Sequence, residues 1–189
     1  MAEYSMVSIP KQSNNAGMPE GKKNIVVLFD FDKVKTYTRD EKSVKVTAFE
    51  LMTGTTTIGI FVNEKTFDAG DAVDGDDYER GFLQHVNFQH PGTDLEFAEF
   101  KGNCINANLG AIIIPCDGSI TTCKIYGTPC APLKMQKADE VDTSEAHRQE
   151  VELQSSSRSY PVGIIDKSDV PATDNAEINA FLGLNTNGI

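Results

Sequence analysis

The chain has 189 residues, of which 39% are hydrophobic and 24% are charged, which suits one domain with a packed core. Its 28 acidic and 17 basic residues give a formal net charge of −11, and this argues against a protein that grips nucleic acid through its phosphates. No apolar run approaches the ~18 residues of a membrane span, and residues 1–14 lack the apolar centre of a secretory signal.

The first 21 residues are expected to form an extended arm. They are rich in Ser, Asn, Gly and Pro, and their apolar residues are scattered singly: Tyr4, Met6, Val7 and Ile9. Such a segment cannot bury enough apolar surface by itself, so these side chains need a surface elsewhere. Residues 22–189 are predicted to form a single β-rich domain.

Three strands and a loop are predicted at the start of this domain. Residues 25–29 are a β-branched and aromatic run typical of a strand buried on both faces. Residues 43–52 alternate in polarity, with a change of phase near Ala48 that indicates a bulge. Residues 55–62 form a third β-rich run, and the Gly- and Asp-rich residues 63–80 are expected to be a solvated loop.

A half-buried strand and a capped helix are predicted next. Residues 81–90 alternate Phe82, Val86 and Phe88 with polar neighbours. Residues 93–96 (Thr-Asp-Leu-Glu) match a capping box, in which the threonine hydroxyl and the glutamate carboxylate satisfy the first free amides of a helix. We expect this principal helix to continue through about residue 106.

The C-terminal half is predicted to add further strands and a short helix. Asp117-Gly118 is typical of a two-residue hairpin turn, whose central residues both need a positive φ. Further expected elements are strands at 109–116, 119–127, 131–136, 149–155 and 160–165, a second acidic loop at 137–147, a helix near 174–182 capped by Thr173 or Asp174 and closed by Gly183, and a loose tail at 184–189.

These elements indicate a mostly β (α+β) fold. Several strands are joined by hairpin-length links, and the strand–helix alternation of a parallel sheet is lacking. We therefore expect an antiparallel β-sandwich or barrel with one packed helix and a short C-terminal helix.

Acidic residues are concentrated in three segments, at 64–80, 137–152 and 166–180. One interpretation is solvated loops that keep the protein in solution. The other is a negative face that repels a polyanion or binds a cation.

The four cysteines, Cys104, Cys116, Cys123 and Cys130, contain no C-x-x-C pair. Reduced, partly buried thiols are the favoured interpretation, with one disulfide or a mixed metal site as alternatives. The three histidines (His85, His90 and His147) are expected to be polar surface positions.

One motif resembles a known catalytic motif. Asp30-Phe31-Asp32-Lys33-Val34 follows an apolar strand and resembles the first motif of haloacid-dehalogenase-type phosphatases. There Asp30 would be the nucleophile and Asp32 the general acid, with Mg²⁺ holding the phosphate. The later residues of that machinery are missing, so two outward carboxylates on an alternating strand are favoured.

The acidic residues 68–79 could wrap Ca²⁺, but they do not match the EF-hand loop in register. No phosphate-binding loop or nucleophile elbow occurs either. We therefore expect no enzyme, and we assign no catalytic, cofactor-binding or metal-binding residue.

The order of elements over residues 81–165 carries a resemblance. After the strand and the capped helix come Lys124-Ile125-Tyr126-Gly127 and Pro132-Leu133, then an acidic excursion and two more strands. This order resembles the major tail, or tail-tube, proteins of tailed bacteriophages, and it covers just under half of the chain.

The resemblance implies a virion structural protein of the phage tail, assembled in the host cytoplasm. Subunits of that family join edge to edge in rings, commonly hexameric, and the rings stack into a tube that passes DNA without sequence-specific contact. The partners would be copies of the chain and other tail proteins, with no membrane. The arm at 1–21 would then order on assembly, and net negative charge would keep DNA from adhering.

Three other hypotheses remain open at this point. The chain could be another small virion part, such as a capsid decoration or connector protein. It could be a monomeric β-sandwich module that binds carbohydrate or protein, with calcium in the 68–79 loop. It could also be a small hydrolase that uses Asp30 and Asp32.

Overall fold

The computed structural model describes residues 21–184, so the predicted arm, apart from Gly21, and the tail beyond Leu184 lie outside the described residues. The strands are β1 (Ile25–Asp30), β2 (Val34–Arg39), β3 (Lys45–Leu51), β4 (Ile58–Phe61), β5 (Asp68–Asp74), β6 (Gly81–Pro91), β7 (Leu109–Ile113), β8 (Thr122–Tyr126), β9 (Leu133–Asp142), β10 (His147–Ser155) and β11 (Gly163–Asp166). Two α-helices, α1 (Leu95–Cys104) and α2 (Ala176–Leu182), and three short 3-10 turns complete the fold. The mostly β, α+β fold class is confirmed.

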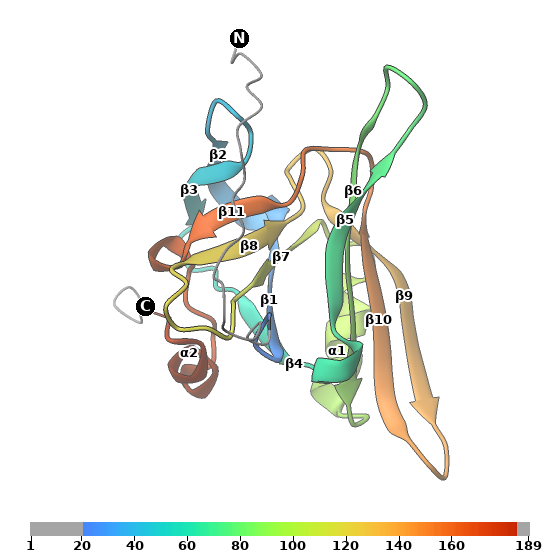
Figure 1. The fold of residues 1–189 in the computed structure, drawn as a ribbon. Coiled ribbons are helices and arrows are strands. Elements are labelled where there is room, and N and C mark those ends of the chain that lie inside the picture. The colour runs from blue at the N-terminus through green and yellow to red at the C-terminus, as the bar shows by residue number, and fades with distance from the viewer. Residues whose placement is uncertain (1–20, 185–189) are drawn as a thin grey trace, which may run out of the picture.

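The strands form one continuous sheet of 11 strands, which we divide into a large and a small sheet because a single residue pair joins the two parts. The large sheet has the order β4-β1-β7-β8-β11-β3-β2, and the small sheet has the order β5-β6-β10-β9. Leu109 of β7 opposite Leu133 of β9 is the pair that joins them. Figure 1 shows the small sheet standing beside the large one, with α1 close to it and α2 at the other side of the molecule. One strand pair, β11 with β3, is parallel, and the other strand pairs are antiparallel as expected.

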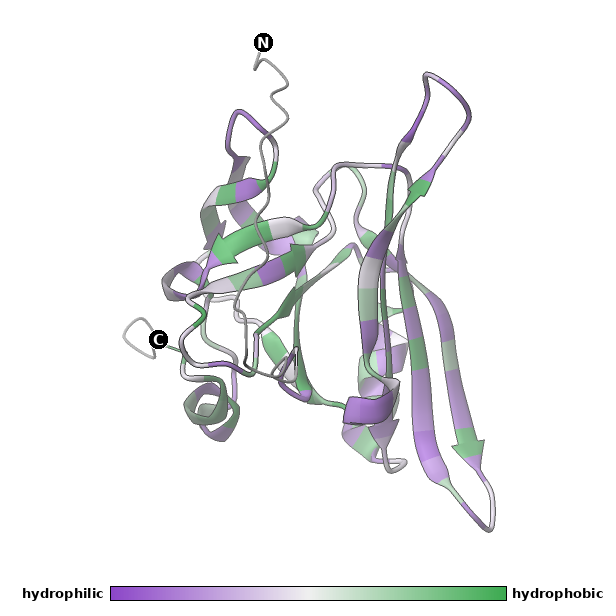
Figure 2. Cartoon of the chain, in the orientation of Figure 1, coloured by the Kyte–Doolittle hydropathy of each residue, from purple (hydrophilic) through white to green (hydrophobic). Residues whose placement is uncertain are grey.

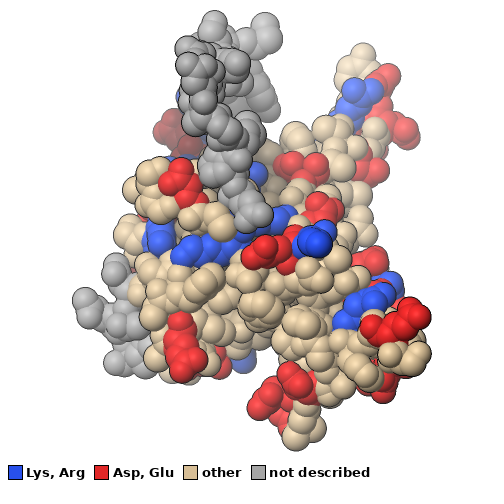
Figure 3. Space-filling view, turned by 60° about the horizontal axis from the view of Figure 1, so that its bottom comes forward, with Lys and Arg blue, Asp and Glu red and all other residues tan. Residues whose placement is uncertain are grey.

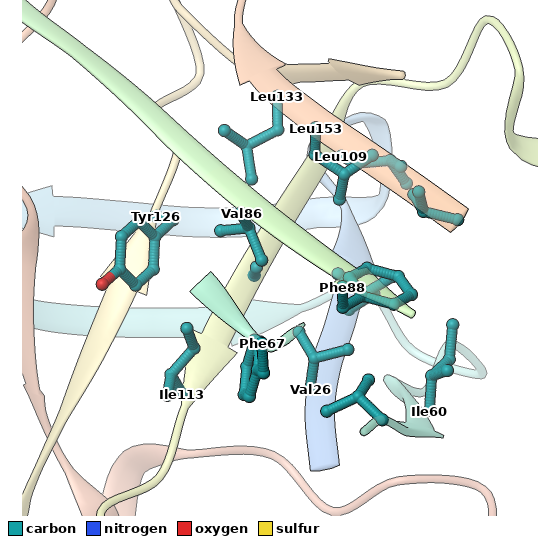
Figure 4. Packing of buried hydrophobic residues seen from close by; sticks show 14 of the residues in the cluster. Val26, Ile60, Phe67, Val86, Phe88, Leu109, Ile113, Tyr126, Leu133 and Leu153 are labelled. Carbon is teal, nitrogen blue, oxygen red and sulfur yellow. The ribbon is translucent and has the colours of Figure 1, made fainter. Parts of the chain in front are cut away.

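The main core lies between the two sheets. Its buried side chains come from β1, β4, β6, β7, β8, β9 and β10, and Figure 4 shows Val26, Val86, Phe88 and Leu153 converging there. The burial pattern follows directly from the sequence, because every second residue of β6 and β10 points to the same face. Phe97 of α1 is buried against this cluster and closes one side of it.

A second core covers the opposite face of the large sheet. It contains Ile25, Val27 and Phe29 of β1 and their neighbours on β7 and β8, and α2 packs against it. Strands β1 and β7 are therefore buried on both faces, as their continuous apolar runs predict. Leu184 is also buried here, so the expected loose tail begins later than predicted.

The two acidic segments predicted as loops each contain a strand. Residues 68–74 pair with β6 along their whole length, and residues 137–142 pair with β10. Figure 2 shows hydrophilic and hydrophobic residues alternating along these hairpins. Acidic residues have only a weak intrinsic preference against strands. Pairing with a neighbouring strand that buries its inner face outweighs this preference.

Two local predictions about turns are wrong. Asp94, not Thr93, precedes the first turn of α1, and neither member of the predicted capping box makes its side-chain bond. Asp117 and Gly118 both lack a positive φ. The Asp117 carboxylate instead accepts hydrogen bonds from the backbone N–H (2.8 Å) and the hydroxyl (2.7 Å) of Ser119, within a longer link between β7 and β8. At α2, Asn175 supplies the N-cap in place of the predicted Thr173 or Asp174, whereas Gly183, with φ 68°, ends the helix as predicted.

A buried glutamine joins three parts of the main core. The side chain of Gln84 on β6 is fully buried. Its amide nitrogen donates to the Tyr160 carbonyl at 2.8 Å, and its amide oxygen accepts from the Gly127 N–H at 2.7 Å. The backbone N–H of Gln84 donates to the Ser155 hydroxyl at 3.0 Å. Because these hydrogen bonds are buried or partly buried, the glutamine fixes the small sheet against the β8 end and residue 160.

Candidate functional site

The most prominent candidate for a functional surface is a pair of open strand edges on the small sheet. Strand β5 pairs only with β6, and β9 pairs with β10 and touches β7 only at its first residue. In the part of the chain that the structure describes, residues 134–142 therefore have no strand partner on their second side. Open edges of this length are unusual in a protein that works as a monomer, because they offer unpaired N–H and C=O groups to other chains.

The hydrogen bonds of β6 show which backbone groups of β5 face outward. Phe82 and Ser159 exchange two backbone hydrogen bonds, of 3.0 and 2.9 Å. The backbone N–H and C=O groups of Phe82 therefore point away from β5. Backbone groups alternate in direction along an antiparallel strand. Since Val73 is opposite Phe82, the N–H and C=O groups of Val73, Asp71 and Ala69 point to the open edge.

The same argument identifies the outward groups of β9. The His147 carbonyl accepts from the Gly92 N–H at 3.0 Å. The backbone groups of His147 therefore point toward β6 and away from its opposite residue, Asp142. Alternation then directs the N–H and C=O groups of Asp142, Glu140 and Ala138 to the open edge. Each edge thus presents three alternate residues with free backbone groups.

The outer face of the small sheet, which points away from the main core, is polar. Its charged centre is Lys137 on β9, whose Nζ lies 2.9 Å from Glu150, 3.6 Å from Asp139 and 3.7 Å from Glu152. Arg148 also contacts Glu150, at 2.9 Å. These hydrogen bonds hold the pKa of the Glu150 carboxyl below its usual value, chiefly through Lys137, and raise the pKa of Lys137. The face is therefore covered by charges that largely compensate one another.

The small sheet is tied to α1 on its inner face. Lys101 Nζ donates to the side-chain oxygen of the buried Gln149 at 2.6 Å and lies 3.4 Å from Glu140. Gln149 in turn donates to Glu140 at 3.0 Å. The hydrogen bonds that Glu140 accepts from Gln149 and from Lys101 lower the pKa of its carboxyl. This network holds the β9–β10 hairpin in place up to Glu140, so one of the two open edges is presented on a supported strand.

The aspartates of the phosphatase-like motif serve local structure. Asp30 ends β1, and its carboxylate accepts from the Asp32 N–H at 3.0 Å, which caps a 3-10 turn at Phe31–Lys33. Asp32 accepts from the Asn108 side chain at 2.9 Å. The expected alternation is wrong here, because the chain turns after Asp30 and Phe31 is buried. Asp30 also borders a largely apolar pocket of about 210 Å³ between β1, β4 and α1.

Residues 68–79, expected to be a solvated loop with Ca²⁺ binding as the alternative, are mostly a strand. Residues 68–74 are β5, and their side chains alternate between the two faces of the sheet. Asp68 lies 3.1 Å from His85, while the Asp71 carboxylate accepts from the Val162 N–H at 3.0 Å on the other face. Among residues 21–184, no three His, Cys, Asp or Glu side chains gather in a way that could hold a metal ion.

The histidines differ in part from the expectation of surface positions. His85, His90 and His147 each lie beside an aspartate, namely Asp68, Asp94 and Asp142. His90 is mostly buried and stacks on the Phe97 ring, with 4.8 Å between ring centroids. Its ring nitrogen also contacts the Phe61 carbonyl at 2.8 Å, so this histidine belongs to the packing between β6, α1 and the end of β4.

All four cysteines are free thiols in very different surroundings. Cys116 and Cys130 are exposed, Cys104 is half-buried and Cys123 is 1% exposed. Burial raises the pKa of Cys123 to about 11 from 9.0. Because the thiolate is the reactive form, burial and this shift both protect Cys123.

We predict that a thiol reagent at pH 8 modifies Cys116 and Cys130 first and Cys123 only after unfolding. Peptide mass mapping at successive times measures the order. Because its pKa is raised, Cys123 binds its proton more tightly in the folded than in the unfolded protein. This contribution to the free energy of unfolding is fully present below pH 9 and is lost as the pH rises toward 11. Modification of Cys123 in the native protein at the rate of Cys116 would contradict the prediction.

In the described part of the chain, neither helix is long and apolar enough to cross a membrane. Comparison with known proteins found no matching family model, no matching curated protein and no matching solved structure.

Proposed function

We propose that this chain is a structural subunit that assembles with copies of itself into rings, and that the rings stack into the tube of a phage tail. The observation that carries the proposal is the pair of open edges on one small sheet, with three free alternate residues on β5 and three on β9. In the proposed ring, β5 of each subunit pairs with β9 of the next.

The directions of the strands support this contact. All neighbouring strands of the small sheet are antiparallel, and the sheet has four of them, so β5 and β9 run in opposite directions. A neighbouring copy can therefore continue the sheet in an antiparallel sense with no reversal of the subunit. Such a contact joins two different surfaces, and repeated contacts of this kind produce a ring when the rotation closes.

The register within the subunit also suits a closed barrel. Asp68, Asn87, Glu152 and Lys137 lie level across the sheet, in that order. On β5 the residues with outward backbone groups lie on one side of this row of residues. On β9, which runs in the opposite direction, they lie on the other side. A neighbour must therefore be shifted along the strands by several residues before the two edges meet, and a stagger of this kind is what tilted strands need to close into a barrel.

In this arrangement the outer face of the small sheet lines the bore. That face is polar, and its cations are occupied by neighbouring carboxylates. DNA needs free Lys and Arg to bind through released counterions. The lining would therefore let DNA pass with little adhesion, and the role that we propose is structural rather than catalytic.

Negative-stain microscopy of the purified protein, with its mass distribution measured by sedimentation, tests the proposal. We expect rings or tubes that coexist with subunits in a concentration-dependent equilibrium. A strictly monomeric species at high protein concentration would count against the proposal and would favour a monomeric binding module.

We predict that deletion of residues 1–20 preserves the fold and blocks tube formation. The two core clusters described above are built from residues between Ile25 and Leu184, so we expect the free energy of unfolding to change little. The apolar residues of the deleted arm would lose their proposed contact with a neighbouring copy. Thermal unfolding and microscopy measure the two effects, and tubes formed by the truncated chain would show that the arm is not required.

A further inference from the structure

Four lysines form a positive band on this acidic protein. Lys22 and Lys23 precede β1, Lys124 lies on β8, and Lys167 follows β11. Figure 3, in which the lower part of the molecule comes forward, shows Lys and Arg gathered in a band across this face. We call these four residues the lysine band.

The charges of the lysine band repel one another. Partial burial is the main cause that lowers the pKa of Lys22 and of Lys23. Among the charges near Lys22, Asp68 raises its pKa and Lys124 lowers it to a smaller extent, while Lys167 lowers the pKa of Lys23. Within residues 21–184, none of the four forms a salt bridge. Like charges held together in this way suit the binding of an anionic partner.

Aromatic rings accompany these lysines. Lys22 Nζ lies 4.4 Å from the ring centroid of Phe67, and Lys23 Nζ lies 4.9 Å from that of Phe181. Phe181 on α2 is half-exposed, and Ile164, between Lys45 and Lys124 in the sheet, is also partly exposed. The band therefore offers positive charge together with accessible apolar surface.

A segment with complementary chemistry projects from the other end of the molecule. The β5–β6 hairpin extends beyond the body of the protein at the top of Figure 1. Its tip carries Asp76, Asp77 and Glu79 around Tyr78, which is fully exposed and has φ 71°. A bulky residue with this φ is uncommon and costs energy, so the fold holds an aromatic ring in solvent at some expense.

We propose that the β5–β6 tip of one subunit docks on the lysine band of a second copy in the adjacent ring. The carboxylates of the tip would meet the band, and the Tyr78 ring would lie among the lysines and beside Phe181, where cation–π contacts are available. This inference rests on the proposed ring, and it assigns the contact that joins one ring to the next.

The alternative acidic hairpin is less suited to this contact. At the β9–β10 tip, Asp142 is beside His147, Glu140 is beside Lys101 and Asp139 is beside Lys137, and only Glu145 forms no salt bridge among the described residues. At the β5–β6 hairpin, Asp77 lies 2.6 Å from Arg80 and Asp74 lies 3.8 Å from Arg158, which also donates to the backbone carbonyl of Glu79 at 2.6 Å. Asp76 and Glu79 form no salt bridge among the described residues, which leaves their charge for a partner.

A charge exchange between the two surfaces tests the contact. One variant carries Lys22→Glu and Lys124→Glu, a second carries Asp76→Lys and Glu79→Lys, and a third carries all four changes. We expect each of the first two to form rings but at least about tenfold fewer tubes, because like charges would meet between rings. The four changes together should restore tubes, since the attraction returns with its sign reversed.

A matched control changes charge elsewhere. Lys33 and Lys42 are exposed and lie outside the lysine band, so Lys33→Glu with Lys42→Glu should form tubes as the unchanged protein does. Microscopy counts rings and tubes for all variants. Tubes that survive in the first two variants, or that are not restored in the third, would overturn the proposed contact while the ring stands. Absence of rings in the unchanged protein would instead overturn the proposed function.

Discussion

Replacement of Val73 by proline should leave the subunit folded and abolish ring formation. Val73 lies on the edge strand β5, is 62% exposed, and directs its backbone N–H outward rather than toward β6. Proline removes that N–H and places its ring at the open edge, where it blocks pairing with another strand. Microscopy should show no rings, and sedimentation should show monomers at concentrations where the unchanged protein assembles.

Val73→Thr is the matched control, because threonine also suits a strand and retains the N–H. We expect it to assemble normally. The free energy of unfolding of both variants, measured in urea, should stay close to that of the unchanged protein, since the bonds between β5 and β6 use Asp68, Gly70, Ala72 and Asp74. Rings formed by a folded Val73→Pro variant would remove the β5 edge from the proposed contact.

Gln84→Leu should destabilise the subunit by about 2–4 kcal/mol, because it leaves one buried and one partly buried backbone group without partners. The Gly127 N–H would lose its acceptor and the Tyr160 carbonyl its donor. Leucine has a similar volume, so little of the loss would come from a cavity. Urea unfolding followed by circular dichroism measures the change in the free energy of unfolding.

Gln154→Leu makes the same substitution at an exposed position on the outer face of the small sheet. We expect a change within about 0.5 kcal/mol there. A Gln84 variant that unfolds at the same urea concentration as the Gln154 variant would show that the buried network is not what holds the small sheet to the β8 end.

Much of the fold could be predicted from local patterns. The apolar run at 25–29 predicts a strand buried on both faces, and β1 is one. The alternation over 81–90 predicts a half-buried strand, and β6 places Val86 and Phe88 in the core. Gly183 ends α2 as expected, because a glycine tolerates the left-handed conformation that closes a helix.

The candidate site was harder to predict. Residues 68–74 consist of Asp, Ala, Gly and Val, a composition typical of loops, and only the pairing with β6 makes them a strand. Gln84 stands among apolar residues of the core face, and its three partners come from distant parts of the chain. The four members of the lysine band are likewise spread from residue 22 to residue 167, so no local pattern identifies them.

The sequence by itself determined the fold class, the strands with continuous apolar or alternating patterns, and the end of α2, because these depend on a residue and its near neighbours. Only the tertiary structure decided the order of strands in the two sheets, the open edges of β5 and β9, and the lysine band. The physical reason is that a strand edge is free or covered according to which distant segments pair beside it, and that pairing depends on long-range packing.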